Sequence, residues 1–271
     1  MDRKEAINLF SRFIPRKTVF FDVIVTEHCN LNCKGCGSFV PLAEKEYINI
    51  EELEMDLNRI SELSHGVMHH INLLGGEPLL HPEIKRIMGM VRRKFNYGII
   101  NLVTNGILLP QMDSEFWNVC CTNRITICPT KYPINVDYLK CEELAKRYNV
   151  EYKYFGDVTQ GGWIHKKIDL GGSRYENSSF MYCSNANMCP VLKHGKIFPC
   201  PTVAHIEKFN KAFKLNLNVD KSDYIDIYNV KNLDEIMFFL TRPIPFCRYC
   251  NTPAITQDEW GISHKDIKEW V

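Results

Sequence analysis

The stretch Glu27-His-Cys-Asn-Leu-Asn-Cys-Lys-Gly-Cys-Gly-Ser-Phe39 places three cysteines in one short loop, directly after the apolar run Val19–Val25. Cys29, Cys33 and Cys36 follow the spacing C-x3-C-x2-C. Three thiolates suit a 4Fe–4S cluster in which one iron lacks a protein ligand, because a purely structural cluster of this kind normally takes four cysteines. An open iron can bind another molecule, so the loop predicts chemistry as well as metal binding.

Two further motifs follow predicted strands. The sequence Gly-Gly-Glu-Pro at 75–78 comes after the apolar run Val67–Leu74, and Thr-Asn-Gly at 104–106 comes after Tyr97–Val103. Paired glycines let a backbone approach a ligand closely, because no Cβ stands in the way. Thr-Asn-Gly alone also suits an ordinary turn, but its place at the end of a strand favours a role in binding.

Together, in this order, the three motifs closely resemble those of the radical S-adenosylmethionine superfamily. One departure is Gly35, because the residue before the third cysteine is often aromatic in that superfamily. The resemblance implies a cluster on Cys29, Cys33 and Cys36 that cleaves S-adenosylmethionine to a 5′-deoxyadenosyl radical. It also implies cofactor contacts from Gly75, Gly76, Glu77, Pro78, Thr104 and Asn105, with Glu77 near the methionine amino group.

Strands and helices alternate over the first two-thirds of the chain, which predicts an α/β fold with a parallel sheet. Asn49 and Glu52 read as a capping pair that opens a helix, and Pro82 suits the first turn of the next one. Further elements are expected at Arg124–Cys128, Val136–Tyr148 and Val150–Phe155. The resemblance implies a partial (β/α)6 TIM-like barrel over residues 1–172, with its active site at the carboxyl ends of the strands.

The remaining residues, 173–271, are expected to form a small α+β domain rich in cysteine. Its run Lys193–Cys200 reads as a β-hairpin with His194-Gly195 at the turn. This region resembles the Twitch or SPASM-like auxiliary domain of radical enzymes, which implies a second 4Fe–4S cluster. Zinc is the alternative, because a C-x2-C pair with two further cysteines also suits that metal. The expected ligands are Cys183, Cys200, Cys247 and Cys250.

Cys189 is the alternative to Cys183 as the first of these ligands. With a two-residue turn at His194-Gly195, Cys189 would face Cys200 across the hairpin, whereas the family's spacing favours Cys183. Twelve cysteines without an export signal indicate metal binding rather than disulfides. The four in the middle of the chain lack ligand spacing and are expected to be small buried hydrophobes; they are Cys120, Cys121, Cys128 and Cys141.

Composition is that of a globular, cytoplasmic protein: 271 residues, 45% of them hydrophobic, with a formal net charge of +1. This charge balance gives no footprint for nucleic acid, no apolar run reaches the length of a membrane span, and the first residues lack the apolar core of a signal peptide. Ile7, Phe10 and Ile14 recur at helical spacing and are expected to face the barrel from a short helix.

A small-molecule substrate is favoured, because little sequence precedes the first strand and a peptide-recognition domain would not fit there. The nearest small relatives in the family act on sugars or aminocyclitols, so a two-electron oxidation of such a substrate is expected, with the auxiliary cluster as electron acceptor. Arg174 is the candidate catalytic residue, although a guanidinium is a poor base. His165, Lys166 and Lys167 lie in the same stretch and more often indicate a solvated loop.

Modification of a ribosomal peptide by oxidation, crosslinking or epimerisation is the alternative function. A non-catalytic iron–sulfur module would leave the three-cysteine loop and the glycine pair unexplained. A flavodoxin or ferredoxin is expected as the electron donor.

Overall fold

The computed structural model describes residues 7, 9–15, 19–161 and 163–271. The chain divides into two compact units. The sheet unit comprises residues 19–31 and 44–163, and the cysteine-rich unit comprises residues 1–18, 32–43 and 164–271. The predicted boundary at residue 172 stays a prediction, because these units follow contacts rather than one cut in the sequence.

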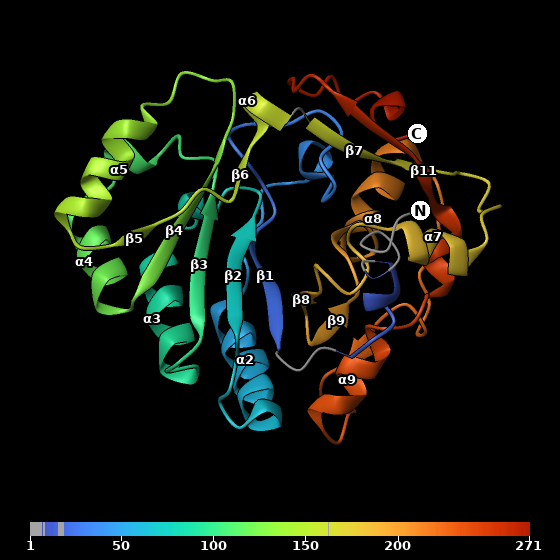
Figure 1. The fold of residues 1–271 in the computed structure, drawn as a ribbon, viewed down its shortest axis with the longest axis horizontal. Coiled ribbons are helices and arrows are strands. Elements are labelled where there is room, and N and C mark those ends of the chain that lie inside the picture. The colour runs from blue at the N-terminus through green and yellow to red at the C-terminus, as the bar shows by residue number, and fades with distance from the viewer. Residues whose placement is uncertain (1–6, 8, 16–18, 162) are drawn as a thin grey trace. The chain divides into compact units, whose positions relative to one another are not determined.

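The sheet unit is built on parallel strands that pair in the order β1-β2-β3-β4-β5 (Figure 1). The strands are β1 Phe20–Thr26, β2 His70–Gly75, β3 Ile99–Thr104, β4 Ile125–Lys131 and β5 Glu151–Tyr152, and β6 Gly156–Asp157 pairs with β4. The helices between them are α2 Ile50–Ser64, α3 Ile84–Lys94, α4 Ser114–Thr122, α5 Tyr138–Arg147 and the short α6 Val158–Gly161. The predicted α/β fold class is confirmed.

Alternation along the strands explains the core of the sheet unit. Residues aligned in the row Val23, Leu73, Leu102 and Ile127 are all fully buried, as expected where helices cover one face of a parallel sheet. Helices α2 and α3 bring the side chains that fill this layer, and they recur at helical spacing; they include Leu53, Leu57, Ile60, Ile87, Met88 and Val91.

A row of polar side chains crosses the same strands one residue away. Asp22, Asn72 and Asn101 are aligned neighbours. The side-chain amide of Asn101 donates to Asn72 Oδ1 over 2.8 Å, and the side-chain amide of Asn72 donates to Asp22 Oδ1 over 2.8 Å. Since successive residues of a strand point to opposite faces, this polar row lies on the sheet face away from the apolar layer.

Several local expectations can be compared with these elements. Asn49 caps α2 by accepting from the Glu52 amide, as predicted. Helix α3 begins at Ile84, so Pro82 precedes the helix instead of lying in its first turn. Helix α4 was not expected, and β5 is shorter than the predicted strand Val150–Phe155.

The cysteine-rich unit holds an antiparallel hairpin of β8 Val191–Lys193 and β9 Lys196–Phe198, and β10 Ile225–Asp226 pairs with β9. His194 and Gly195 have φ of 48° and 68° at the turn, the two positive values that a type I′ hairpin requires. The predicted hairpin is therefore confirmed. The unit also contains α7 Glu176–Tyr182, α8 Pro201–Phe213 and α9 Leu233–Phe239, and β7 Trp163–Ile168 pairs with β11 Cys250–Asp258.

Two expectations about apolar residues are wrong in part. Ile7, Phe10 and Ile14 are 58%, 61% and 61% exposed, so they do not pack on a core; Phe13 packs against Phe180 instead, with ring centroids 5.1 Å apart. Cys120, Cys128 and Cys141 are buried as predicted, but Cys121 is only half-buried. Adjacent helical residues point about 100° apart, so Cys120 and Cys121 cannot both face the same core.

Candidate cofactor and metal sites

The glycine pair at the end of β2 packs directly on the backbone that leads from β1 to Cys29. The Gly76 amide donates to the Thr26 carbonyl over 2.8 Å, and the Glu77 amide donates to the His28 carbonyl over 2.9 Å. A Cβ on Gly75, whose φ is +156°, would lie 2.2 Å from the Thr26 oxygen, and one on Gly76 would lie 1.9 Å from the His28 oxygen. Both glycines are therefore required for this close packing. The group that packs against them is the protein's own backbone leading into the cysteine loop.

Glu77 follows with a fully buried carboxylate. Its oxygens accept hydrogen bonds from Thr104 Oγ1 at 2.7 Å, from the Asn105 amide at 2.8 Å and from the Leu79 amide at 3.0 Å. Burial raises the pKa of Glu77 to about 7, although these three donors act in the opposite direction. Glu77 thus joins the ends of β2 and β3. Its side chain also caps the short 3-10 helix η2 Pro78–Leu80, which begins at the buried Pro78.

Asn105 extends this network to the first cysteine. Its side-chain amide donates to Asn30 Oδ1 over 2.7 Å and contacts Cys29 Sγ at 3.6 Å. Its Oδ1 accepts from the Ile107 amide at 3.0 Å, and its carbonyl accepts from the Tyr138 hydroxyl at 3.3 Å. The structure therefore brings together one member of each of the three sequence motifs.

Sequence reasoning missed Asn30 and Tyr138. Asn30 stands beside Cys29, and a carboxamide next to a metal ligand was a usable signal. Tyr138 lies on α5 and also donates to the Thr130 carbonyl over 3.2 Å, a role that depends on the fold and has no local pattern.

Cys33 and Cys36 belong to the cysteine-rich unit. Cys33 is buried, and its backbone forms an antiparallel bridge with Ile262. The Cys36 carbonyl accepts from the Phe39 amide and from the Trp270 indole, both over 2.9 Å. Gly35 between them has a φ of 63°, the left-handed conformation that glycine adopts most readily, which accounts for glycine at this position.

The predicted auxiliary ligands lie at the ends of elements in the cysteine-rich unit. Cys183 caps the end of α7, Cys200 precedes α8, Cys247 lies in the 3-10 helix η4 Pro245–Tyr249, and Cys250 opens β11. Burial is the main cause that raises the pKa of Cys247 to about 12, and the Cys200 and Cys183 thiols contribute to this rise. The Cys183 and Cys200 thiols thus lie near enough to influence the charge of Cys247.

Cys189, the alternative ligand, lies beside Asn185: its amide donates to the Asn185 carbonyl over 3.2 Å, and its sulfur is 4.0 Å from Asn185 Oδ1. The outermost aligned pair of the hairpin is Val191 with Phe198, so the strands end before the predicted Cys189–Cys200 pair. The choice between Cys183 and Cys189 stays a prediction.

The available donors fit iron–sulfur chemistry. Both predicted sites consist of cysteine sulfur, the ligand that iron–sulfur clusters take, and an amide directed at Cys29 Sγ is the type of hydrogen bond that tunes such ligands. Within the described part of the chain, no three histidine, cysteine or acidic side chains lie close enough together to hold a single metal ion.

Arg174 lies in a tight loop of the cysteine-rich unit. Its Nε donates to Asp169 Oδ2 over 3.1 Å, and its side chain is 44% exposed. Asp169 also accepts from Ser173 Oγ at 2.7 Å and from the Gly171 amide at 3.0 Å, so the guanidinium is held by a carboxylate that is itself fixed. Lys167 Nζ donates to the Lys268 carbonyl over 3.2 Å. The side chains of His165 and Lys166 lie outside the described part.

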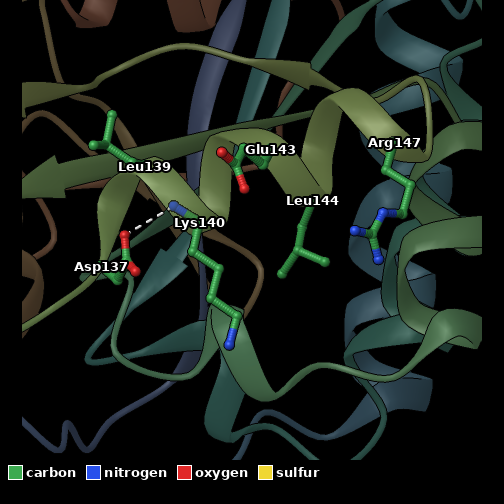
Figure 2. Close-up of a pocket in the computed structure, with 6 residues that line it drawn as sticks. All are labelled: Asp137, Leu139, Lys140, Glu143, Leu144 and Arg147. Atoms are coloured by element: carbon green, nitrogen blue, oxygen red, sulfur yellow. Dashed lines mark hydrogen bonds between the residues drawn. The ribbon is translucent and has the colours of Figure 1, made fainter.

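A cavity of about 500 Å³ lies beside α5 and contains none of the predicted site residues. Figure 2 shows its lining, which includes the cap of α5, where the Lys140 amide donates to Asp137 Oδ1 over 2.9 Å. The residues that line it are Asp137, Leu139, Lys140, Glu143, Leu144 and Arg147. Because charged residues of one helix dominate the lining, we assign it no part in the candidate site.

The parallel α/β fold and the motifs gathered at its strand ends define an enzyme class that uses S-adenosylmethionine with an iron–sulfur cluster. The family model described as the Radical SAM superfamily matches residues 23–127. A GTP 3′,8-cyclase of Clostridium botulinum (strain Langeland) is 31% identical over 90% of this chain and 80% of its own length. The chain belongs to the radical SAM superfamily, which implies a 4Fe–4S cluster, S-adenosylmethionine and a reductant.

Two other relatives bear on length and fold. Molybdenum cofactor biosynthesis protein 1 of Bos taurus is 31% identical over 60% of this chain, but the match spans only 25% of that protein. The crystal structure of BtrN in complex with AdoMet and 2-DOIA superposes with a TM-score of 0.56 at 16% identity, covering 95% of this chain and 100% of that one. None of the described helices is long and apolar enough to cross a membrane.

Proposed function

We propose that this chain is a radical S-adenosylmethionine oxidoreductase that oxidises an alcohol carbon of a small polar molecule, of the sugar or aminocyclitol type. The observation that carries the proposal is the network at the strand ends, in which the Gly-Gly-Glu and Thr-Asn-Gly motifs both bond to the segment that carries Cys29. The parts that the sequence separates are thereby assembled in one place within the sheet unit.

The residues of the first site have distinct proposed roles. Cys29, Cys33 and Cys36 bind the iron of a 4Fe–4S cluster as thiolates, and Asn105 fixes the Cys29 end through its bonds to Asn30 and the cysteine sulfur. The glycine pair, Thr104 and Asn105, at the ends of β2 and β3, would hold S-adenosylmethionine. Because Glu77 spends both oxygens on protein donors, we assign it the role of holding these strand ends in position.

The second site is proposed to hold another 4Fe–4S cluster through Cys183, Cys200, Cys247 and Cys250. When bound, the two clusters and S-adenosylmethionine supply a 5′-deoxyadenosyl radical and a closed one-electron acceptor, the two functions that a two-electron oxidation of a carbinol requires. This ligand set is supported by the positions of the four cysteines at the ends of elements in one unit, and by the influence of Cys183 and Cys200 on the charge of Cys247.

Arg174 is proposed to hold a hydroxyl or carboxylate of the substrate. Its guanidinium donates hydrogen bonds and accepts none, and Asp169 keeps it oriented. A flavodoxin or ferredoxin is the proposed electron donor.

The names of the relatives favour a small-molecule substrate. GTP 3′,8-cyclase is named for a nucleotide, and the BtrN structure contains 2-DOIA. GTP therefore belongs in the substrate panel beside sugars and aminocyclitols, and short ribosomal peptides test the alternative.

The experiment is anaerobic reconstitution with iron and sulfide, followed by reduction, addition of S-adenosylmethionine and the substrate panel, and detection of 5′-deoxyadenosine by mass spectrometry. Changing Cys29, Cys33 and Cys36 to Ala should remove about half of the bound iron and all 5′-deoxyadenosine. The Cys121→Ala variant is the matched control and should keep both. Reductive cleavage of the cofactor by the triple variant would overturn the proposal.

The fate of the cofactor separates oxidation from isomerisation. An oxidation consumes one S-adenosylmethionine for each product, whereas deuterium returning from labelled cofactor to product would show an isomerase. The Cys247→Ala/Cys250→Ala variant should still cleave the cofactor yet stall before product, with Cys189→Ala as its control. Normal product from a folded variant that lacks the second cluster would refute the electron-acceptor role.

A further inference from the structure

Within the cysteine-rich unit, the 32–43 loop, which carries Cys33 and Cys36, lies along a segment far away in sequence, residues 261–270 (the 261–270 segment). The Lys34 amide donates to the Gly261 carbonyl over 2.8 Å, and the Ser263 amide donates to the Asn32 carbonyl over 2.9 Å. These bonds flank the antiparallel bridge at Cys33. The backbone on both sides of Cys33 is therefore held by the 261–270 segment.

Trp270 makes the corresponding contact at Cys36. Its indole N–H donates to the Cys36 carbonyl over 2.9 Å, and the side chain is only 1% exposed. The ring packs among aromatic side chains from the loop and from α8, with centroids 6.1 to 6.3 Å away; they are Phe39, Phe209 and Phe213. The Trp270 carbonyl in turn accepts from the Ile168 amide of β7 over 2.7 Å. Both ends of this residue are thus fixed.

The loop needs such support because its backbone is strained at Phe39. Phe39 has a φ of 53° and Asn32 a φ of 53°. A bulky side chain takes this left-handed conformation only where its surroundings hold it there. Besides the aromatic contacts at Phe39, the Lys208 ammonium of α8 donates to the Ser38 carbonyl over 3.1 Å. The surrounding contacts, and not the loop's own preference, set its shape.

The 261–270 segment is itself rigid enough to act as a support. Glu269 is 5% exposed and accepts from Ser263 Oγ at 2.6 Å and from the His264 amide at 2.7 Å. With Asp266 it forms a capping box at the start of the 3-10 helix η5 Ile267–Glu269, which ends directly before Trp270. The carboxylate of Glu269 therefore ties the start of the segment to its end.

We propose that the 261–270 segment positions Cys33 and Cys36 of the 32–43 loop for iron binding, with Trp270 as a positioning residue for Cys36. The inference rests on the proposed function, because it assigns these cysteines to the S-adenosylmethionine-cleaving cluster. Trp270 touches neither cluster nor cofactor in this role. It acts through the carbonyl of Cys36, where its indole N–H fixes the peptide next to the ligand.

The test variant is Trp270→Phe, which keeps an aromatic ring and removes the N–H donor. The matched control is Trp117→Phe in α4: Trp117 is also 1% exposed, but its indole nitrogen is buried with no hydrogen-bond partner among the described residues. Both variants lose similar volume, and only one loses a hydrogen bond.

Two measurements are made on the full chain. The first is amide hydrogen exchange of residues 36–43, with and without metal, which should accelerate about fivefold in Trp270→Phe, the factor expected for one lost hydrogen bond. The second follows the electron paramagnetic resonance spectrum of the reduced, reconstituted protein, because only the cluster with an open iron responds to S-adenosylmethionine. In Trp270→Phe that response should shift or shrink, and a chelator should remove iron faster than from the control.

The outcomes separate the inference from the proposed function. If the wild-type protein shows no spectral response to S-adenosylmethionine, the proposed function fails. If the wild-type protein responds, and Trp270→Phe matches Trp117→Phe in both loop exchange and spectral response, the positioning role is wrong. Faster exchange with an unchanged spectrum also overturns it, because Trp270 would then only stabilise the fold.

Discussion

At the scale of single residues, Glu77 shows how a motif residue can support the site through hydrogen bonds to the protein itself. Three donors from two strand ends converge on its carboxylate, which has no exposure to solvent. A buried acceptor of this kind is costly to disturb, because each unmatched donor loses its hydrogen bond without gaining one from water.

Replacing Glu77 with Gln is expected to lower the free energy of unfolding by about 1–3 kcal/mol, because the new NH2 group faces a donor where an acceptor is needed. The amide of Asn105 should also exchange faster. Urea unfolding monitored by circular dichroism measures the first effect, and mass-spectrometric hydrogen exchange the second. Glu142→Gln, at an exposed position of α5, is the control. Equal stability of the two variants would show that the network contributes little.

The sequence identified the candidate residues of the first site because its signals are local. Cysteine spacing, a glycine pair and a Thr-Asn-Gly turn can each be read within a few residues. The directions of the side chains cannot be read this way. That Glu77 turns toward Thr104, and that Asn105 turns toward Asn30, depends on the parallel pairing of strands that lie far apart in sequence.

At the scale of elements, the polar row Asp22–Asn72–Asn101 crosses the first three strands of the sheet. Burial raises the pKa of Asp22 to about 6, although its bond from Asn72 acts to lower it. A carboxyl whose pKa is higher in the folded state stabilises the fold at low pH, and that contribution is lost as pH rises through the folded pKa.

The free energy of unfolding of the wild-type protein, relative to Asp22→Asn, should therefore fall between about pH 4 and pH 7. Asparagine does not titrate, so the variant removes this slope and leaves the other titrating groups in place. Urea unfolding across this range measures the difference. Parallel pH profiles for the two proteins would mean that the Asp22 pKa is the same in the folded and unfolded chain.

Elements with strong patterns were predictable and short ones were not. Helix α2 has a capping residue and a long apolar stripe, so its position follows from sequence. Helix α4 is short and has few core positions, Phe116, Trp117 and Cys120, which give too little periodicity to distinguish it from a buried loop. Strand β5 covers only Glu151 and Tyr152, although the Lys153 and Phe155 amides still donate to the Ile127 and Pro129 carbonyls of β4, so the predicted strand follows β4 beyond the regular ladder.

At the scale of the whole molecule, the contact units do not follow the chain in order. Residues 32–43 belong with residues 164–271, although they are flanked in sequence by the sheet unit. No composition or spacing signal marks this exchange, because it depends on contacts such as Trp270 with Cys36. A single predicted domain boundary at residue 172 could not assign residues 32–43 to the second unit.

The twelve cysteines offer a test of the complete metal assignment. After anaerobic reconstitution, seven should be protected by iron, and burial should protect Cys120, Cys128 and Cys141. Brief alkylation followed by mass spectrometry should then label Cys121 and Cys189. Metal-free protein is the control and should also be labelled at the half-buried ligand cysteines. Label on Cys183 with protection of Cys189 would exchange these two in the ligand set.

The fit between the glycine pair and the Thr26–Cys29 backbone has an evolutionary consequence. Since Gly75 and Gly76 leave no room for a Cβ against the chain itself, selection for folding alone would preserve them. A homologue that had lost its iron and its activity would still retain the Gly-Gly-Glu motif. In such pseudoenzymes the cysteines would be substituted first. The residues at positions 29, 33 and 36, and not the glycines, would therefore distinguish an active enzyme from an inactive homologue.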